Sequence, residues 1–509
     1  MGFAEVLSRA QTGLAAPLVR VEVHLGSGLP NFMVVGLPAP VVKESRERVR
    51  AALAHCGFEL PAGRITVNLA PADLPKVGGR FDLPIALGIL IASGQLRTRL
   101  DLTRTEFYGE LALTGELKSV PGLLLAALHA GRAGHALVIP RGSAPDVSGA
   151  GAALVFGLAH LRELAEGVAL EALQIDTMAP RAATVASPQP DLADVRGQWQ
   201  GKRALLIAAA GFHSLLMKGP PGSGKTMLAQ RLPGLLPPLG QAEALEVAAI
   251  AAVAQSPPGT AGPGGPSGLP PFRAPHHTAS AHAIVGGGVA VQPGEISLAH
   301  HGVLFLDELP EFDRRVLEGL REPLESGRVS VVGASPRADK PPPLQQVAAM
   351  NPCPCGRAGL VHPRCRCQPA QVERYRARIS GPLLDRIDLQ LDLPMVDSSA
   401  LIGPADAAQH PGACGSSAAA RELVCRARQR QLARQGKLNA KLEAGETLAC
   451  CRADAASLEL LRCAARQRAH SARSQHRVLR VARSIADLAD RDAVSAADVA
   501  EALALRWEA

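Results

Sequence analysis

The chain has 509 residues, enough for roughly two or three domains with well-packed cores that need no disulfides. Its longest apolar stretch begins at Leu83 and runs for about a dozen residues, which is too short to cross a bilayer. The N-terminus has no basic segment followed by an apolar one, so no signal peptide is expected. We therefore expect a cytoplasmic protein with reduced cysteines and no membrane contact.

The positive charge is concentrated near the C-terminus. The net charge is +8, from 54 basic and 46 acidic residues. Residues 421–480 contain 14 Lys and Arg against 5 Asp and Glu, as expected of a face that meets a polyanion. Solvated helix faces in an Arg-rich chain have the same composition, so charge alone leaves both interpretations open.

The hydrophobic pattern predicts two mixed blocks, at residues 1–180 and 191–396, joined by a linker at 181–190. A final helical block is predicted at residues 397–509. In the two mixed blocks, short apolar runs alternate with helical segments, which is typical of α/β or α+β domains. The linker, RAATVASPQP, is polar and contains proline. The last helix is predicted to begin with a capping box of Ser495 and Asp498.

A phosphate-binding loop is predicted within SLLMKGPPGSGKTMLAQRL. An apolar strand from Ser214 to Met217 leads into a glycine-rich loop and then an apolar-periodic helix, which is the context that this motif requires. Lys225 is expected to reach the β- and γ-phosphates of ATP and Thr226 to hold Mg²⁺. Backbone amides and the helix N-terminus would face the phosphates. The predicted nucleotide-binding residues of the loop are Gly219, Pro220, Pro221, Gly222, Ser223, Gly224, Lys225 and Thr226.

An acidic pair is predicted to complete the hydrolytic site. Four apolar residues, Val303 to Leu306, predict a buried strand that ends at Asp307 and Glu308. Asp307 takes the Mg²⁺ role and Glu308 the role of the base that polarises the attacking water. Such a pair is a weak signal alone, but behind a phosphate-binding loop it predicts an ATPase.

Two further residues are assigned to the catalytic site. The stretch LQQVAAMN predicts a strand that ends on Asn351, whose amide is expected to orient the lytic water and sense the γ-phosphate. In isolation this Asn would more often be a turn-former before Pro352. GPLLDRIDLQLDLP places Arg386 at the head of a strand, where it forms a salt bridge within the fold or reaches the γ-phosphate of a neighbouring subunit. The second role requires a ring.

Four of the ten cysteines lie within NPCPCGRAGLVHPRCRC: Cys353, Cys355, Cys365 and Cys367. Four thiolates in this pattern fit one tetrahedral structural Zn²⁺, although the C-x-C spacing is tighter than usual. A reduced compartment argues against two disulfides, and four protein ligands argue against a catalytic metal. A compact knuckle of reduced thiols is the alternative.

The motifs GPPGSGKT, LFLDE, AAMNPCPCG and GPLLDRID, in this order and spacing, resemble those of AAA+ ATPases of the magnesium-chelatase-like branch, and among them the ComM/YifB-type proteins. The resemblance covers essentially the whole chain. It implies an α/β fold with a P-loop AAA+ core at 191–396, a four-cysteine insertion at 353–367 and a C-terminal helical lid at 397–509. It also implies ATP and Mg²⁺ as cofactors and a homo-oligomeric ring, by similarity a hexamer. For ComM it implies a DNA helicase that acts in branch migration during recombination of transforming DNA.

Smaller features are assigned by the same resemblance. Within SARSQHRVLRVARSIADLA, which is similar to the family's lid, Arg473 is the expected second sensor and Arg477 the fallback. The stretch before Asn351 resembles a pre-sensor hairpin that offers a threading ligand the basic residues Arg328, Arg337 and Lys340. The family carries His276, His277 and His282 within an insertion between the Walker motifs, and we expect no metal role for them.

The N-terminal block, residues 1–180, resembles the proteolytic domain of Lon-type proteases without its catalytic dyad. Alignment on the two Lon motifs places Arg80 at the serine position and Leu124 at the lysine position. Without a nucleophile or a base, no peptidase activity is expected.

Three rival functions remain beside a DNA translocase. A chelatase-type motor that remodels a protein partner is disfavoured by the N-terminal block. An ATP-dependent protease is opposed by Arg80 and Leu124. A scaffold with a silent ATPase is opposed by the complete set of motif residues. Single-stranded or branched DNA is the expected partner.

Overall fold

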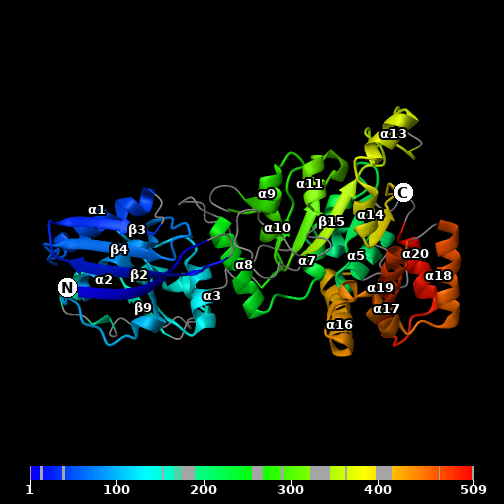
Figure 1. Ribbon diagram of the computed structural model, residues 1–509. Helices are drawn as coiled ribbons and strands as arrows, with labels where there is room; N and C mark the ends of the chain where they lie inside the picture. Colours follow the sequence, from blue (N-terminus) through cyan, green and yellow to red (C-terminus); the bar gives the residue numbers. More distant parts are fainter. Residues whose placement is uncertain are drawn as a thin grey trace.

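The molecule consists of three lobes in a row, an N-terminal lobe, a central lobe and a C-terminal helical lobe (Figure 1). The computed structural model describes residues 2–11, 15–36, 40–151, 154–166, 169–170, 174, 190–254, 268–287, 292–320, 344–360, 364–396, 415–468 and 471–506. The predicted linker, apart from Pro190, lies outside these ranges. The predicted hairpin with Arg328, Arg337 and Lys340 also lies outside them.

A seven-stranded mixed sheet forms the N-terminal lobe, in the order β3-β4-β2-β1-β5-β8-β9. Its strands are β1 (Gly2–Arg9), β2 (Leu18–Gly26), β3 (Asn31–Val35), β4 (Arg64–Ala70), β5 (Thr105–Phe107), β8 (Ala136–Pro140) and β9 (Val155–Leu158). β2 pairs antiparallel with β1 and β4, whereas β1, β5, β8 and β9 follow one another in parallel. A separate two-stranded ladder joins β6 (Glu110–Leu111) and β7 (Leu117–Lys118). The predicted mixture of strands and helices is confirmed.

Helices complete the core of this lobe. They are α1 (Pro40–His55), α2 (Asp82–Ala92), α3 (Leu123–Ala133) and α4 (Arg162–Ala165). The apolar stretch from Leu83 forms most of α2, which packs against β1 and β2 and is buried along nearly its whole length. Its composition therefore reflects burial on all sides within a globular core. Among the described residues, no helix is long and apolar enough to cross a membrane.

Arg80 and Leu124, the two residues that the resemblance aligns with the Lon dyad, have buried side chains. Arg80 is buried in a short 3-10 helix, Gly79–Phe81, where it donates to Gln11 Oε1 and to the carbonyl of Pro121, both at 2.7 Å. Burial lowers its pKa. Leu124 lies in α3 within an apolar cluster. Neither side chain is a nucleophile or a base, as the sequence indicates.

A five-stranded parallel sheet in the order β11-β14-β15-β10-β16 forms the central lobe. Its strands are β10 (Leu215–Lys218), β11 (Phe272–Arg273), β14 (Val303–Leu306), β15 (Gln345–Met350) and β16 (Leu389–Asp392). The strand predicted at Val303–Leu306 is confirmed at both ends, and the one predicted at 214–217 begins one residue later. Since neighbouring parallel strands end at the same edge, the segments after β10, β14 and β15 meet there.

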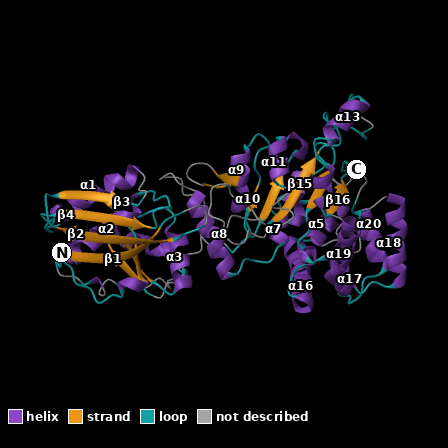
Figure 2. Ribbon diagram, viewed as in Figure 1, coloured by secondary structure: helices purple, strands orange, loops and turns teal. Residues whose placement is uncertain are grey.

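Helices cover both faces of this sheet (Figure 2). The helices of the central lobe are α5 (Trp199–Gly211), α6 (Lys225–Ala229), α7 (Leu232–Leu235), α8 (Gln241–Ala254), α9 (Ala281–Val285), α10 (Glu295–Leu298), α11 (Arg314–Gly319) and α14 (Gly381–Arg386). One more helix, α13 (Pro369–Arg376), projects from the lobe (Figure 1). A small ladder pairs β12 (Gly286–Gly287) with β13 (Gln292–Pro293). Along β10, Leu215 and Met217 belong to one apolar cluster and Leu216 to the other, as the alternation of a strand requires. Burial on both faces explains the continuous apolar run.

The C-terminal lobe is helical, as predicted. Its helices are α16 (Ser417–Gln435), α17 (Ala444–Cys451), α18 (Ala455–Arg468), α19 (Ala472–Leu488) and α20 (Ala496–Ala504). The capping box predicted at the start of α20 is confirmed, because Asp498 accepts from the backbone N–H of Ser495 at 2.9 Å. Val478 of α19 and Leu205 of α5 belong to the same apolar cluster. The helical lobe therefore shares its core with one face of the central sheet.

The N-terminal lobe contacts the central lobe through α3 and α8, which lie side by side in Figure 1. Ala127 and Ala130 of α3 share an apolar cluster with Leu245, Ala249 and Val253 of α8. Small side chains on α3 allow this close approach of the two helices. An ion pair at 2.7 Å between Arg132 and Glu246 continues the contact.

Candidate nucleotide-binding site

The glycine-rich loop connects β10 to α6, as the motif predicts. Gly222 and Gly224 have φ angles of 80° and 88°, a left-handed conformation that residues with a Cβ avoid. Lys225 donates through Nζ to the carbonyls of Gly219 at 2.7 Å and Pro220 at 2.9 Å. Burial lowers the pKa of Lys225, while Asp307 and Glu308 act in the opposite direction. A buried ammonium group is therefore held at the mouth of the loop.

Thr226 and Asp307 meet at the edge of the sheet. The Thr226 hydroxyl donates to Asp307 Oδ2 at 2.8 Å. Two oxygen ligands in neighbouring positions of octahedral Mg²⁺ lie about 3 Å apart, given metal–oxygen bonds of about 2.1 Å. The hydroxyl and carboxylate thus fit the shell of that ion, which is the pairing that the sequence predicts.

Glu308 lies beyond Asp307 in a left-handed conformation, with a φ angle of 52°. Its backbone N–H donates to Asp307 Oδ1 at 2.9 Å, and its carboxylate Oε2 lies 3.0 Å from His277 Nδ1. His277 follows β11, the strand next to β14. The sequence motifs do not predict this contact, because His277 and Glu308 lie far apart along the chain. His277 lies in the loop after β11, so no local sequence signal marks its contact with Glu308.

Asn351 follows β15, which lies between β14 and β10. The predicted strand is confirmed, but it ends at Met350, one residue before Asn351. The Asn351 Oδ1 atom accepts from Lys225 Nζ at 3.3 Å. An amide so placed shares the space where a γ-phosphate and its attacking water would lie.

Two residues that sequence reasoning missed hold the loop in place. Gln198 donates through one Nε2 atom to the carbonyls of Ser223 and Pro394, each at 2.8 Å. Gly356 packs against Pro221, and a Cβ at this glycine would lie 2.7 Å from Pro221 Cδ. These contacts join segments that are far apart in the chain, so no local sequence signal indicates them.

The predicted arginines lie on α14 and α19. Arg386 is the last residue of α14 and donates to the carbonyl of Pro382 at 2.7 Å. Its predicted place at the head of a strand is wrong, because a short helix precedes β16. Arg473 lies in the first turn of α19. Arg477, on the same helix, donates to the carbonyl of Asp385 and lies 4.0 Å from Asp388. These two aspartates flank Arg386 in the chain.

The four clustered cysteines converge directly behind Asn351. The Sγ atoms of Cys353, Cys355 and Cys365 lie 3.4 to 3.6 Å apart, and with Cys367 all four lie within 4.8 Å of one another. Thiolates around tetrahedral Zn²⁺ lie about 3.8 Å apart, so the set fits that ion. A backbone hydrogen bond from Arg357 lowers the pKa of Cys355 to about 6. All cysteines in the described part of the chain are free thiols.

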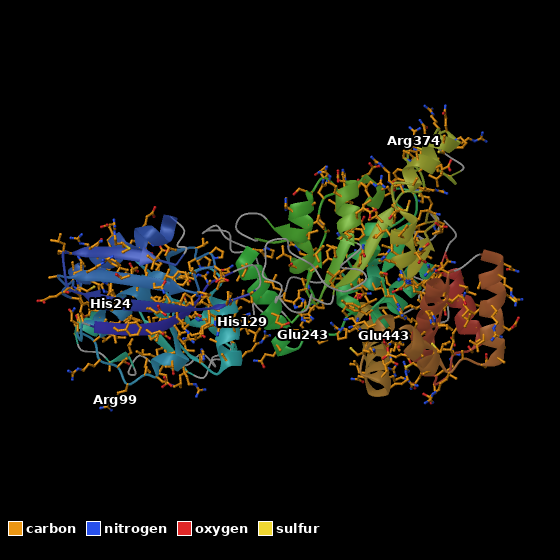
Figure 3. All side chains as sticks on the ribbon, viewed as in Figure 1. His24, Arg99, His129, Glu243, Arg374 and Glu443 are labelled. Atoms are coloured by element: carbon orange, nitrogen blue, oxygen red, sulfur yellow. The ribbon has the colours of Figure 1, made fainter. Side chains whose placement is uncertain are left out.

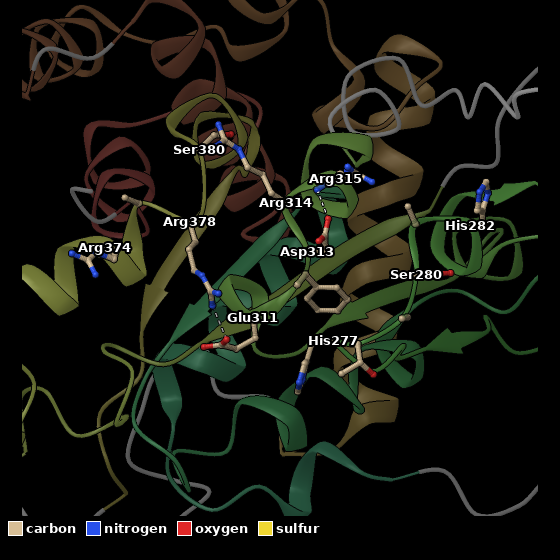
Figure 4. Close-up of a pocket in the computed structure, with 15 residues that line it drawn as sticks. His277, Ser280, His282, Glu311, Asp313, Arg314, Arg315, Arg374, Arg378 and Ser380 are labelled. Atoms are coloured by element: carbon tan, nitrogen blue, oxygen red, sulfur yellow. Dashed lines mark hydrogen bonds and ion pairs between the residues drawn. The ribbon is translucent and has the colours of Figure 1, made fainter.

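A cavity of about 1000 Å³ has His277 and several basic side chains on its wall (Figure 4). Its lining includes Arg314, Arg315, Arg374 and Arg378 together with His277. Arg378 pairs with Glu311 at 2.7 Å on the same wall. The tip of α13 carries Arg374 outward from the central lobe (Figure 3). The cavity is therefore lined in part by basic side chains, and His277 on its wall also contacts Glu308.

These contacts place the chain in the class of P-loop nucleotide-binding proteins. Models of magnesium chelatase match it along most of its length: subunit ChlI at residues 191–401, subunit ChlI of Mg-chelatase at 21–143 and the ChlI C-terminal part at 415–506. It is 46% identical to an uncharacterized YifB protein of Salmonella typhimurium, over 99% of this chain and 97% of that one. It is 45% identical to the competence protein ComM of Haemophilus influenzae, over 99% and 98%.

The chain belongs to the magnesium-chelatase-like family of ComM and YifB proteins. An uncharacterized protein of Mycobacterium bovis is also similar, with 40% identity over 99% of both chains. The family is one of AAA+ ATPases, which agrees with the arrangement around the loop.

Proposed function

We propose that this protein is a ring-forming ATPase that uses ATP hydrolysis to move along DNA in the cytoplasm. The observation that carries the proposal is the meeting of Lys225, Thr226, Asp307 and Asn351 at one edge of the central sheet. Each has the chemistry that its place around a triphosphate requires. Similarity to the competence protein ComM of Haemophilus influenzae supports a competence-related role. We propose that this role is branch migration in the recombination of transforming DNA.

Hydrolysis follows from the placement of these side chains. Lys225 neutralises the β- and γ-phosphates, and the loop amides orient them. Glu308 accepts a proton from the attacking water, which Asn351 positions. When bound, Mg²⁺ on Thr226 and Asp307 would screen the phosphate charge. Arg386 from a neighbouring subunit would stabilise the transition state, and Arg473 would report the nucleotide to the helical lobe.

Two charge features support DNA as the partner. The cavity lined by Arg314, Arg315, Arg374 and Arg378 offers guanidinium groups, which suit phosphate oxygens. Residues 421–480 add 14 basic side chains against 5 acidic ones. Contacts of this kind weaken steeply as salt rises. A hexamer is the ring we propose, by similarity to the family.

The other two parts receive supporting roles. We assign the four-cysteine cluster a structural Zn²⁺ that stiffens the insertion next to the glycine-rich loop. For the N-terminal lobe we propose a Lon-type fold without peptidase activity, because the resemblance aligns Arg80 and Leu124 with the catalytic dyad.

The test is ATP hydrolysis by the purified protein with and without single-stranded, duplex and four-way junction DNA, at low and moderate salt. We expect DNA to stimulate hydrolysis at low salt, with less stimulation at moderate salt. Lys225→Ala and Glu308→Gln should each abolish the stimulated rate. A rate indifferent to all three DNAs would contradict the proposal.

A chelatase-type motor that remodels a protein partner is the second candidate. It is favoured by the matches to three magnesium chelatase models. Hydrolysis that ignores DNA but requires Lys225 and Glu308 would move this candidate to first place.

A further inference from the structure

A second cluster of metal-ligating side chains lies beside the start of β14, at the opposite end of this strand from Asp307. Glu246 is on α8, and His300 and His301 form the turn between α10 and β14. The Nε2 atoms of both histidines face the same carboxylate oxygen, Oε2 of Glu246, at 3.2 Å from His300 and 3.1 Å from His301. His301 has a φ angle of 55°, a costly conformation for a residue other than glycine. This backbone turn brings two adjacent rings to one oxygen.

The spacing fits a bound metal ion. Nitrogen and oxygen ligands held at about 2.0 to 2.2 Å from one ion lie roughly 3 to 3.4 Å from each other. The two measured nitrogen–oxygen distances fall in that range, and all three ligand atoms lie within 4.8 Å. Hydrogen bonds from the two imidazoles to Glu246 would have the same lengths. The side chains around the cluster therefore have to distinguish a metal site from a hydrogen-bonded one.

Neighbouring charges orient this donor set. Arg132 from α3 donates to the other oxygen of Glu246 at 2.7 Å, which leaves Oε2 facing the imidazoles. The carboxylate of Glu243 lies 3.8 Å from His301 Nδ1, on the far side of that ring from Nε2. A carboxylate behind a ligating imidazole is the usual support of a metal-bound histidine. Glu243 lies on α8, between the N-terminal and central lobes (Figure 3).

We propose that Glu246, His300 and His301 bind one divalent transition-metal ion, with Zn²⁺ as the fitting ion. Two imidazoles and one carboxylate suit Zn²⁺, Co²⁺ or Ni²⁺ better than Mg²⁺ or Ca²⁺, which prefer oxygen. Three protein ligands leave a fourth position for water. The ion would tie α8, which contacts the N-terminal lobe, to the turn that leads into β14 and Asp307.

The experiment measures Co²⁺ binding to the full chain after chelation, by metal content and by absorption. Co²⁺ bound to the four cysteines can be distinguished from Co²⁺ bound to this cluster, because only thiolate ligands give charge-transfer absorption. We expect one further equivalent of Co²⁺ without that absorption. Substitution of both histidines, His300→Ala with His301→Ala, should remove it. Glu246→Gln, which keeps the size of the side chain and an acceptor for the imidazole N–H groups, should weaken it at least about ten-fold.

The matched control is His276→Ala with His282→Ala, which removes as many imidazoles and should keep the equivalent. Far-UV circular dichroism of the chelated proteins reports folding, and Glu246→Gln decides the outcome if the double variant does not fold. The inference is overturned if wild type and Glu246→Gln bind the same amount of Co²⁺ with the same affinity, or if every equivalent shows thiolate absorption.

Discussion

At the scale of single residues, His277 and Glu308 form the contact with the clearest consequence for turnover. A carboxylate oxygen that is occupied by an imidazole at 3.0 Å is less available to an attacking water. His277→Ala should therefore raise ATP hydrolysis in the absence of DNA by about 2- to 10-fold, since one net hydrogen bond contributes about 0.5 to 1.5 kcal/mol.

Steady-state hydrolysis without DNA is the measurement for this variant. His282→Ala, from the wall of the same cavity, is the matched control and should leave the rate unchanged. A lower rate in His277→Ala would mean that the histidine positions Glu308 for catalysis.

The residues of the nucleotide site differ in how far the sequence predicts them. The loop from Gly219 to Thr226 is predicted completely, because a strand, glycines and a helix start are local signals. His277 and Gln198 were missed, since their contacts with Glu308 and Ser223 join segments distant along the chain. The functional roles of Asn351, Arg386 and Arg473 stay predictions.

At the scale of elements, β1 and β5 are joined by a buried ion pair. Arg9 donates to both oxygens of Glu106, whose side chain has no exposed surface. Removal of the guanidinium leaves a buried carboxylate without its main partner. Arg9→Met should therefore lower the free energy of unfolding by about 3 to 5 kcal/mol.

Urea denaturation of the full chain would measure this loss in the transition of the N-terminal lobe. The control is Arg20→Met on β2, where an exposed pair with Glu5 at 3.8 Å should contribute about 0 to 1 kcal/mol. Equal effects of the two substitutions would contradict the assigned importance of burial.

The cysteine insertion gives a second prediction at this scale. Loss of one ligand should release its Zn²⁺ and loosen the packing of Gly356 on Pro221. Cys365→Ser should hold about one equivalent of zinc less than wild type and show a raised KM for ATP. Cys463→Ser, at an exposed cysteine on α18, should change neither. If Cys365→Ser holds as much zinc as the wild type, the cysteines do not bind zinc, and the knuckle of reduced thiols is favoured.

Elements are predicted best where one signal dominates. The run from Val303 to Leu306 lies between Gly302 and Asp307, and its strand is confirmed at both ends. Arg386, predicted at the head of a strand, is instead the last residue of α14, and β16 begins at Leu389. Pro382 near the helix start was the signal overlooked, since proline favours the first helical turn.

At the scale of the molecule, the order of the strands and the contacts between lobes lie beyond sequence patterns. The place of β15 between β14 and β10 brings Asn351 to Lys225. The contact between α3 and α8 links two lobes whose residues lie about a hundred positions apart. Apolar periodicity predicts that such faces are buried, but it does not name the partner.

The central claim is that hydrolysis at Lys225 and Glu308 drives movement along DNA. The most direct test is branch migration of a synthetic four-way junction by the purified protein, with ATP and Mg²⁺. We predict conversion of the junction into duplex products by the wild type, and none with Glu308→Gln or with a non-hydrolysable ATP analogue. An intact junction in the presence of active ATP hydrolysis would contradict the account.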